Sequence, residues 1–113
     1  HLSLPYDHPP RSNQIRSGRG STAKFELSLN MIEQLLKWTT EHATTLFQFG
    51  LTAFYIFLFK LTQQTDLCIL TVSANRRRVE LEELIGFFAN TVPHRLSIDP
   101  QSNFRSLVDT VKE

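Results

Sequence analysis

Hydrophobic residues follow two different periods along this chain, and the two periods predict strands and helices in turn. Between residues 22 and 28 every second residue is apolar, which is typical of a strand with one buried face. Apolar residues then recur at helical spacing as far as about His42, and Asn30 with Glu33 matches a capping box at the start of this helix. The first third of the chain therefore predicts a strand followed by an amphipathic helix.

The most apolar stretch covers residues 46–61 and contains five phenylalanines. Thr45 and Gln48 match a second capping box, so we expect a helix to begin here. A membrane-spanning helix needs about 20 apolar residues, whereas this run is shorter and is interrupted by Gly50 and Thr52. We therefore predict a helix buried inside a globular protein, with more aromatic surface than the rest of the chain can cover.

A third pattern lies between residues 66 and 98. The continuous apolar run from Leu67 to Val72 predicts a strand buried on both faces. An acidic stretch at residues 80–84 predicts a short helix, and a second strand is expected from Val92 to Ile98. A glycine and a pair of phenylalanines between the two strands would put the polar residues Asn90 and Thr91 at the mouth of an apolar wall, which suits a ligand channel.

The end of the chain predicts one more helix. Asp99 and Pro100 suit its start, because proline is favoured at the first helical position. Four apolar residues at helical spacing would dock it on the sheet, namely Phe104, Leu107, Val108 and Val111. The whole order of elements predicts an α/β fold, with a mixed sheet and helices packed on it.

Composition narrows the possible functions. The net charge is +1, which gives no long-range field to attract nucleic acid or an anionic membrane. No histidines or cysteine lie at metal-ligand spacing, so no metal site is expected. The lone Cys68 lies in the apolar strand, and we interpret it as a small buried residue rather than a nucleophile. The absence of a recognisable signal peptide favours the cytoplasm.

Three segments resemble one known family. Residues 85–95, IGFFANTVPHR, resemble the IGxFxNTxxxR motif of the condensation domains of nonribosomal peptide synthetases. Residues 66–76 resemble the strand and turn that precede this motif in the family, and residues 4–10 resemble its LPxDxPRP segment. Two departures are Ala89, where valine is usual, and His94, where an aliphatic residue is usual.

The resemblance implies a place in a larger domain. The catalytic HHxxxDG motif of the family lies upstream of the LPxDxPRP segment, and this chain has no His-His pair. We therefore expect an extended connector at residues 1–20. Residues 21–113 would then form part of the C-terminal subdomain, with a chloramphenicol-acetyltransferase-like fold. No catalytic residue is expected in this chain, so alone it is expected to be inactive in peptide biosynthesis and to self-associate through its exposed apolar surface.

The resemblance also implies the chemistry of the parent protein. A condensation domain, an acyltransferase-like enzyme, joins an upstream aminoacyl or peptidyl thioester to the amine of a downstream aminoacyl thioester. Both substrates would arrive on the phosphopantetheine arms of carrier domains, so no cofactor is expected to bind the chain directly. The expected partners are these carrier domains and the N-terminal half of the condensation domain.

Five residues are candidates for the site. The resemblance implies that Arg76 holds the aspartate of the HHxxxDG motif through a bidentate ion pair, although an arginine after a strand commonly anchors a loop instead. It also implies a substrate tunnel lined by Gly86, Phe88, Asn90 and Thr91. The alternative for Asn90 and Thr91 is a β-bulge beside Pro93, which does not suit a central strand.

Other functions are weaker alternatives. His94 on the second strand could act as a base, but the catalytic histidine of the family lies elsewhere, so a surface or packing role is favoured. An epimerisation domain of the same superfamily is disfavoured, since it normally carries a Gly-Trp-Phe-Thr type segment at residues 87–90. A degenerate domain that only docks other domains stays open. A nucleic-acid binder built on residues 76–78 is disfavoured by the acidic run beside them.

Overall fold

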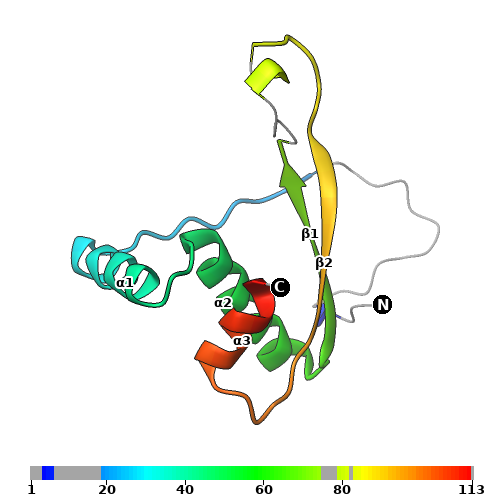
Figure 1. Ribbon diagram of the computed structural model, residues 1–113. Helices are drawn as coiled ribbons and strands as arrows, with labels where there is room; N and C mark the ends of the chain where they lie inside the picture. The colour runs from blue at the N-terminus through cyan, green and yellow to red at the C-terminus, as the bar shows by residue number, and fades with distance from the viewer. Residues whose placement is uncertain (1–3, 7–18, 75–78, 82, 113) are drawn as a thin grey trace, which may run out of the picture.

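The structure is a computed structural model that describes residues 4–6, 19–74, 79–81 and 83–112. Its elements, in chain order, are α1 (Leu29–Glu41), α2 (Leu46–Thr62), β1 (Asp66–Ser73), a 3-10 turn (Val79–Leu81), β2 (Asn90–Ser97) and α3 (Phe104–Lys112). Figure 1 shows β1 and β2 as a long hairpin, with α2 and α3 against its lower half and α1 standing out to one side. The predicted α/β class is confirmed.

The two strands pair in antiparallel fashion without a break. The register runs from Asp66 opposite Ser97 to Ser73 opposite Asn90, one residue against one. Pro93 lies within this ladder, opposite Leu70, so the alternative of a β-bulge beside it is wrong. A proline fits here because the described sheet has two strands only, which leaves the outer edge of β2 without a neighbouring strand.

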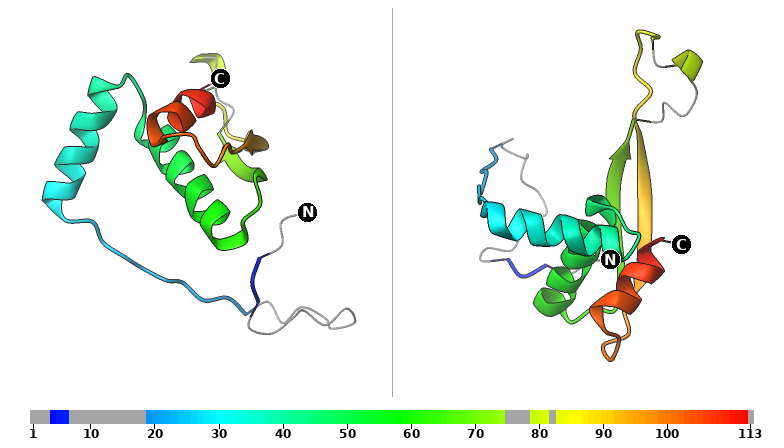
Figure 2. Two further views of the ribbon diagram at one scale, coloured as in Figure 1. Left: turned by 90° about the horizontal axis from the view of Figure 1, so that it is seen from below. Right: turned by 60° about the vertical axis from the view of Figure 1, so that its left-hand side comes forward.

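Among the residues that the structure describes, only one face of the hairpin is covered by other elements. Along β1, buried or half-buried residues alternate with exposed ones, and the same alternation runs along β2. The prediction of a strand buried on both faces is therefore wrong, since α2 and α3 form a layer on one side only (Figures 1 and 2). Cys68 points to the open side and is exposed, which corrects the prediction of a buried thiol.

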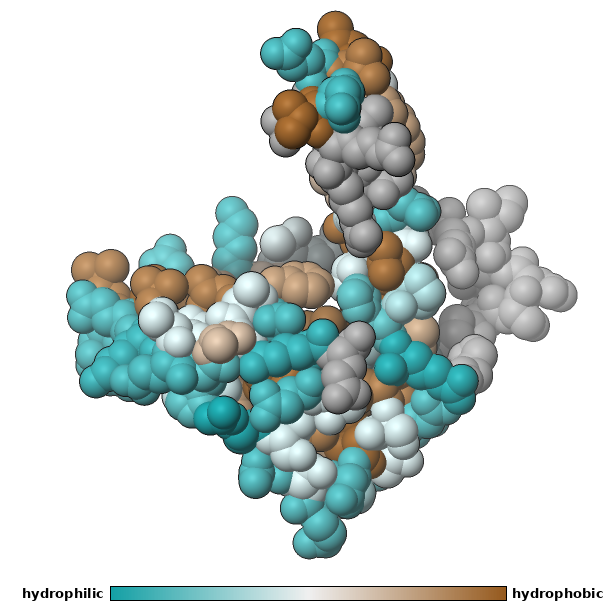
Figure 3. All heavy atoms as spheres, in the orientation of Figure 1, coloured by the Kyte–Doolittle hydropathy of each residue, from teal (hydrophilic) through white to brown (hydrophobic). Residues whose placement is uncertain are grey.

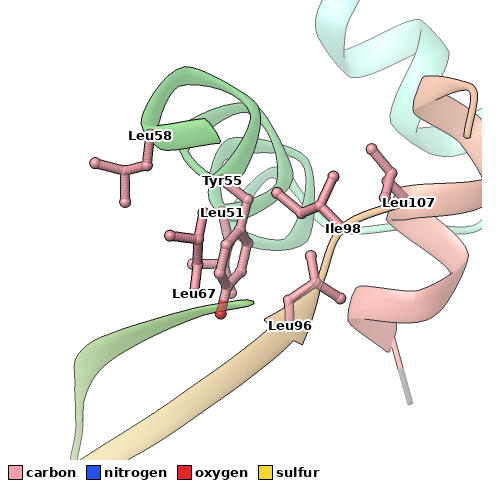
Figure 4. Packing of buried hydrophobic residues seen from close by; sticks show 7 residues of the cluster. All are labelled: Leu51, Tyr55, Leu58, Leu67, Leu96, Ile98 and Leu107. Atoms are coloured by element: carbon pink, nitrogen blue, oxygen red, sulfur yellow. The ribbon is translucent and has the colours of Figure 1, made fainter. Parts of the chain in front are cut away.

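The core lies where α2 and α3 meet the lower part of the hairpin. Its side chains come from four elements and the residue after β2, and Figure 4 shows them converging: Leu51, Tyr55, Leu58, Leu67, Leu96, Ile98 and Leu107. Tyr55 is 1% exposed, and its hydroxyl donates a hydrogen bond to the carbonyl oxygen of His94 at 2.6 Å. Burial raises the pKa of this phenol. The docking of the last helix is confirmed, because Leu107 and Val108 are both buried.

The starts of α1 and α2 test the two capping boxes predicted from the sequence. At α2 the capping box is present as predicted: the Thr45 hydroxyl accepts from the Gln48 amide, and the Gln48 side chain accepts from the Thr45 amide. At α1 the cap is Ser28, whose hydroxyl accepts from the Met31 amide. The predicted box at Asn30 is wrong because this residue already lies inside the helix, where its side chain accepts from Gln34 instead.

The last helix begins later than predicted. Asp99 and Pro100 lie in a turn, in which the Asp99 carbonyl accepts from the amide of Ser102. The cap of α3 is Asn103, whose side-chain oxygen accepts from the Ser106 amide at 2.9 Å. A proline favours a helix start and also a turn, and here the turn closes first.

Residues 22–28 are extended but form no strand. The alternation in the sequence produces no buried face: all seven residues are exposed, Phe25 to 84%, and no described strand lies beside this segment. A strand needs a partner backbone for its amide and carbonyl groups, and the sequence pattern alone does not supply one. The prediction of a strand here is therefore wrong for this structure.

The helix α1 joins the rest through an aromatic cluster. The ring of Trp38 stacks on His42 with centroids 4.1 Å apart and meets Phe49 and Phe104 edge-on at 5.3 and 5.5 Å. The Lys112 ammonium, near the end of α3, donates to the His42 carbonyl oxygen at 3.0 Å. Figure 2 shows the C-terminal end of α1 close to α2, while its N-terminal end lies further from the other helices.

The molecule is more open than a compact domain of its length. The radius of gyration is 17.7 Å, against about 13 Å for a compact domain of ~100 residues. Hydrophobic residues lie exposed along α2, among them Phe47, Phe54 and Phe57, and more appear over α1 and the hairpin tip in Figure 3. The prediction that the phenylalanines of this helix exceed the available cover is confirmed.

Candidate functional site

The open face of the hairpin carries a defined set of exposed side chains. Four residues of β1 lie directly opposite four residues of β2, and all eight point away from α2 and α3: Asp66, Cys68, Leu70 and Val72 with Ser97, Arg95, Pro93 and Thr91. We call this set the open face. It brings one of the predicted tunnel residues, Thr91, together with residues that the sequence pattern had assigned to a doubly buried strand.

Asn90 and Thr91 point to opposite sides of the sheet. They are the first two residues of β2, and consecutive residues of a strand face in opposite directions. Asn90 pairs with Ser73 on the side that faces the helices, whereas Thr91 pairs with Val72 on the open face. Both are exposed, so both are accessible, but a single wall of a tunnel would contain only Thr91.

Gly86 and Phe88 lie in the connection before β2. The ring of Phe88 lies over Gly86, so that a Cβ atom at this position would be 3.1 Å from the nearest ring carbon. A side chain at residue 86 would therefore push the ring aside. Their neighbour Phe87 is 92% exposed. The connection thus packs the Phe88 ring against its own backbone and leaves the Phe87 ring exposed to solvent.

An ion pair that the sequence pattern did not predict lies at the end of the open face away from Thr91. The Arg95 guanidinium donates two hydrogen bonds to the Asp66 carboxylate, at 2.8 Å from Nε and 2.6 Å from the terminal nitrogen. The hydrogen bond from Arg95 lowers the pKa of Asp66, and the same contact raises the pKa of Arg95. The signal was present in the sequence, since these charges lie almost opposite once the strands are aligned.

His94 lies on the side of β2 that faces α2. Its Nε2 atom shares a hydrogen bond with the Thr71 hydroxyl at 2.8 Å, and the ring of Phe47 lies edge-on at a centroid distance of 6.1 Å. The Tyr55 hydroxyl bonds to its backbone carbonyl. These contacts support a packing role for His94 and place its ring away from the open face.

The remaining candidate lies outside the described residues. Arg76, expected to hold an aspartate of the catalytic motif, is one of residues 75–78, which lie outside the described ranges, as do Arg77 and Arg78. Within the described ranges, no group of three or more histidine, cysteine, aspartate or glutamate side chains is placed to hold a metal ion. In the same ranges no single helix is long and apolar enough to cross a membrane. Only α1 and α2 taken together have that length and hydropathy, and the two helices are bent by 105° relative to each other.

A concave surface lies beside α2, between this helix, α1 and the extended segment before α1. We call it the α2 groove; its lining is apolar throughout and includes Phe25, Leu27, Leu46, Gly50, Ala53 and Phe57. No side chain that lines it can donate or accept a hydrogen bond. Such a surface suits the packing of another apolar element better than it suits chemistry.

Comparison with protein families gives one match over the whole chain. Residues 1–113 match the family model described as the condensation domain. Cyclosporin synthetase of Tolypocladium inflatum is 43% identical over 99 residues, which cover 88% of this chain and 1% of that protein. Bacitracin synthase 1 of Bacillus licheniformis is 30% identical over 112 residues, which cover 99% of this chain and 2% of that protein. The chain therefore spans a very small part of these curated relatives.

Solved structures share the arrangement of the elements. A four-domain nonribosomal peptide synthetase bound to AMP and glycine is similar with a TM-score of 0.74 and 30% identity, over 77% of this chain and 7% of that chain. The first condensation domain of the CDA synthetase is similar with a TM-score of 0.66 and 21% identity, over 71% of this chain and 18% of that chain. The second likeness supports the fold alone.

Proposed function

This chain belongs to the condensation-domain family of nonribosomal peptide synthetases, and we propose that it is part of a domain that forms amide bonds between carrier-bound substrates. The observation that carries the proposal is the family match over every residue of the chain. The place of residues 21–113 in the C-terminal subdomain is part of the same proposal. It is supported by the order of the LPxDxPRP and IGxFxNTxxxR segments.

The proposed reaction joins two thioester-bound groups. The amine nitrogen of the downstream aminoacyl group attacks the thioester carbonyl carbon of the upstream group. A C–N bond forms and the C–S bond breaks, and the phosphopantetheine thiol leaves with the proton that the amine gives up. This chain would contribute one wall of the site where the two groups meet, while the histidines of the HHxxxDG motif would come from the N-terminal half.

Within that wall, we assign the contact with substrate to Thr91. Its hydroxyl lies on the open face and can donate to a thioester carbonyl or accept from an attacking amine, which would hold one reactant in position. Asn90, on the opposite side of the strand, would support the end of the hairpin and the rim of the tunnel. Gly86 and Phe88 would shape the loop above it. Arg76 would hold the aspartate of the catalytic motif.

The experiment uses the complete parent domain with aminoacyl thioesters loaded on its carrier domains, and mass spectrometry measures the condensed product. Thr91→Val keeps the side-chain shape and removes the hydroxyl, so turnover should fall roughly tenfold to a hundredfold if the hydroxyl orients a reactant. Asn90→Ala should reduce turnover less. The matched control is Ser97→Ala, which removes a hydroxyl from the same face about 20 Å away, at ~3.4 Å per residue.

The outcomes separate the possible roles. Unchanged turnover in Thr91→Val would remove this residue from the site. If the unaltered parent makes no amide product with any substrate, the enzymatic proposal fails and a docking role takes its place.

The partners and location follow from the same proposal. Carrier domains would present the substrates, and the N-terminal half of the domain would complete the tunnel. We also propose that the parent works in the cytoplasm, because a free exposed thiol such as Cys68 suits a reducing compartment.

A further inference from the structure

The end of the open face beside Thr91 is apolar and accessible. Val72 lies directly opposite Thr91 and is 77% exposed. The next pair along the same face is Leu70, 66% exposed, and Pro93, which is also exposed. A group held by the Thr91 hydroxyl would therefore have three aliphatic side chains immediately beside it.

The charged groups of this face lie at its other end and neutralise each other. Asp66 and Arg95 share a bidentate contact, with the closest nitrogen–oxygen distance at 2.6 Å. Asp66 is six residues before Val72, which separates the two by roughly 20 Å along an extended strand. A charged substituent beside Val72 would find no partner among the eight residues of the open face, because their two charges already pair with each other.

We propose that Leu70, Val72 and Pro93 form a subsite for the side chain of a carrier-bound amino acid, and that this subsite selects uncharged, apolar side chains. The inference rests on the proposed amide-forming function, which it extends from the reaction to the class of substrate. An aliphatic side chain placed there loses contact with water at no electrostatic cost, whereas an ammonium or carboxylate would be desolvated with no unpaired charge among the eight residues of the open face to compensate it.

Comparison with the α2 groove explains why the occupant is a substrate and not another element of the protein. The groove is apolar throughout, and a Cβ atom added at Gly50 would meet nothing within 4 Å, so it has room for a packed backbone. The open face instead combines three aliphatic side chains with one hydroxyl that can orient a ligand. A mostly apolar wall with a few placed polar groups is the usual composition of a small-molecule site.

The test introduces a charge into the subsite of the complete parent domain. Val72→Asp is assayed with donor and acceptor thioesters that carry leucine, glycine or lysine, varied one partner at a time. We expect kcat/KM to fall roughly tenfold to a hundredfold for leucine on one partner, to change little for glycine, and to rise for lysine. The partner that shows this change identifies whether the donor or the acceptor side chain occupies the subsite.

The matched control is Cys68→Asp. It places the same charge on the same face and strand, about 14 Å from residue 72 at ~3.4 Å per residue, and opposite the guanidinium of Arg95. Side-chain preference should stay as in the unaltered parent. A second variant, Val72→Ala, reduces the apolar wall without a charge, and the preference for leucine over glycine should fall several-fold.

Two outcomes overturn the inference. If Val72→Asp folds and lowers the rate for all three side chains equally, the residue does not contact the side chain. If Val72→Asp does not fold and Val72→Ala leaves the leucine preference unchanged, the subsite is also wrong. In both cases the unaltered parent still forms amide product, which separates this failure from failure of the proposed function.

Discussion

The base of the molecule and its outer parts contain the same kinds of residue in different surroundings. At the base, apolar side chains from α2, α3 and both strands bury one another, and Tyr55 and Leu67 are each 1% exposed. In the outer parts, Phe25, Leu29 and Ile85 are 84%, 79% and 105% exposed. The residue types do not distinguish the two regions. The presence of a second layer does, and this layer exists only where segments distant in sequence meet.

This difference extends to the two faces of a single strand. Leu67 and Leu70 are three residues apart in β1, yet one lies in the core and the other on the open face. The burial of a leucine in this molecule therefore depends on whether a second layer covers its side of the strand, and not on the residue type. The following variants test how sharply the two environments differ.

The largest effect is expected for Leu67→Ala. Removing a fully buried leucine leaves a cavity, and the free energy of unfolding should fall by about 2–5 kcal/mol. Leu70→Ala in the same strand is the matched control, and its effect should stay within about 0.5 kcal/mol because the side chain is exposed. Chemical denaturation of the complete domain, followed by circular dichroism, measures both. Equal losses for the two variants would remove the distinction between the faces.

An intermediate effect is expected for the start of α2. Thr45→Ala removes one half of the capping box, and the free energy of unfolding should fall by about 1 kcal/mol. Ser28→Ala removes the single cap of α1, which contacts the core at one end only, so the loss should appear as local opening instead. Amide hydrogen exchange distinguishes the two, with faster exchange confined to α1 for Ser28→Ala. Global destabilisation by Ser28→Ala would show that α1 belongs to the packed base.

The smallest effect concerns the ion pair on the open face. Hydrogen bonding from Arg95 keeps the pKa of Asp66 below its ordinary value of 3.8. Its contribution is therefore present above the unfolded pKa and is lost as the pH falls through the lower, folded pKa. Stability between about pH 5 and pH 2 should decline more steeply for the unaltered chain than for Asp66→Asn.

Both partners of this pair are exposed, which limits the difference in slope. Asp109 titrates in the same range, since a hydrogen bond from Lys112 lowers its pKa, but it is present in both proteins and does not affect the comparison. Identical slopes for the two proteins would show that the pair contributes nothing to folding.

Local patterns were sufficient for the elements that carry their own signals. The capping box at Thr45 and the apolar run after it placed α2 correctly, and the strands were found to within two residues of their ends. Residues 22–28 were misassigned because alternation describes side chains, whereas a strand also needs backbone partners. The late start of α3 followed from competition between a turn at Asp99 and a cap at Asn103, which residue preferences alone do not resolve.

The candidate site was predictable only in part. Thr91 and Asn90 were found together because they are adjacent in a family segment, and their separation onto opposite faces appeared only with the register of the strands. Leu70, Val72 and Cys68 looked like core residues because a continuous apolar run is typical of a strand covered on both sides. The Asp66–Arg95 pair spans 29 residues of sequence and needs the alignment of two strands before it can be seen.

The sequence by itself determined the family, the helices and the approximate positions of the strands, because these depend on short motifs, caps and the period of apolar residues. Only the tertiary structure decided which side of each strand is covered, which residues form the core and which charges pair. These properties arise from contacts between segments that are distant in the chain, and α2 and α3 occupy one side of the hairpin only. That one-sided cover leaves Thr91 and its aliphatic neighbours on the open face, where we place the substrate.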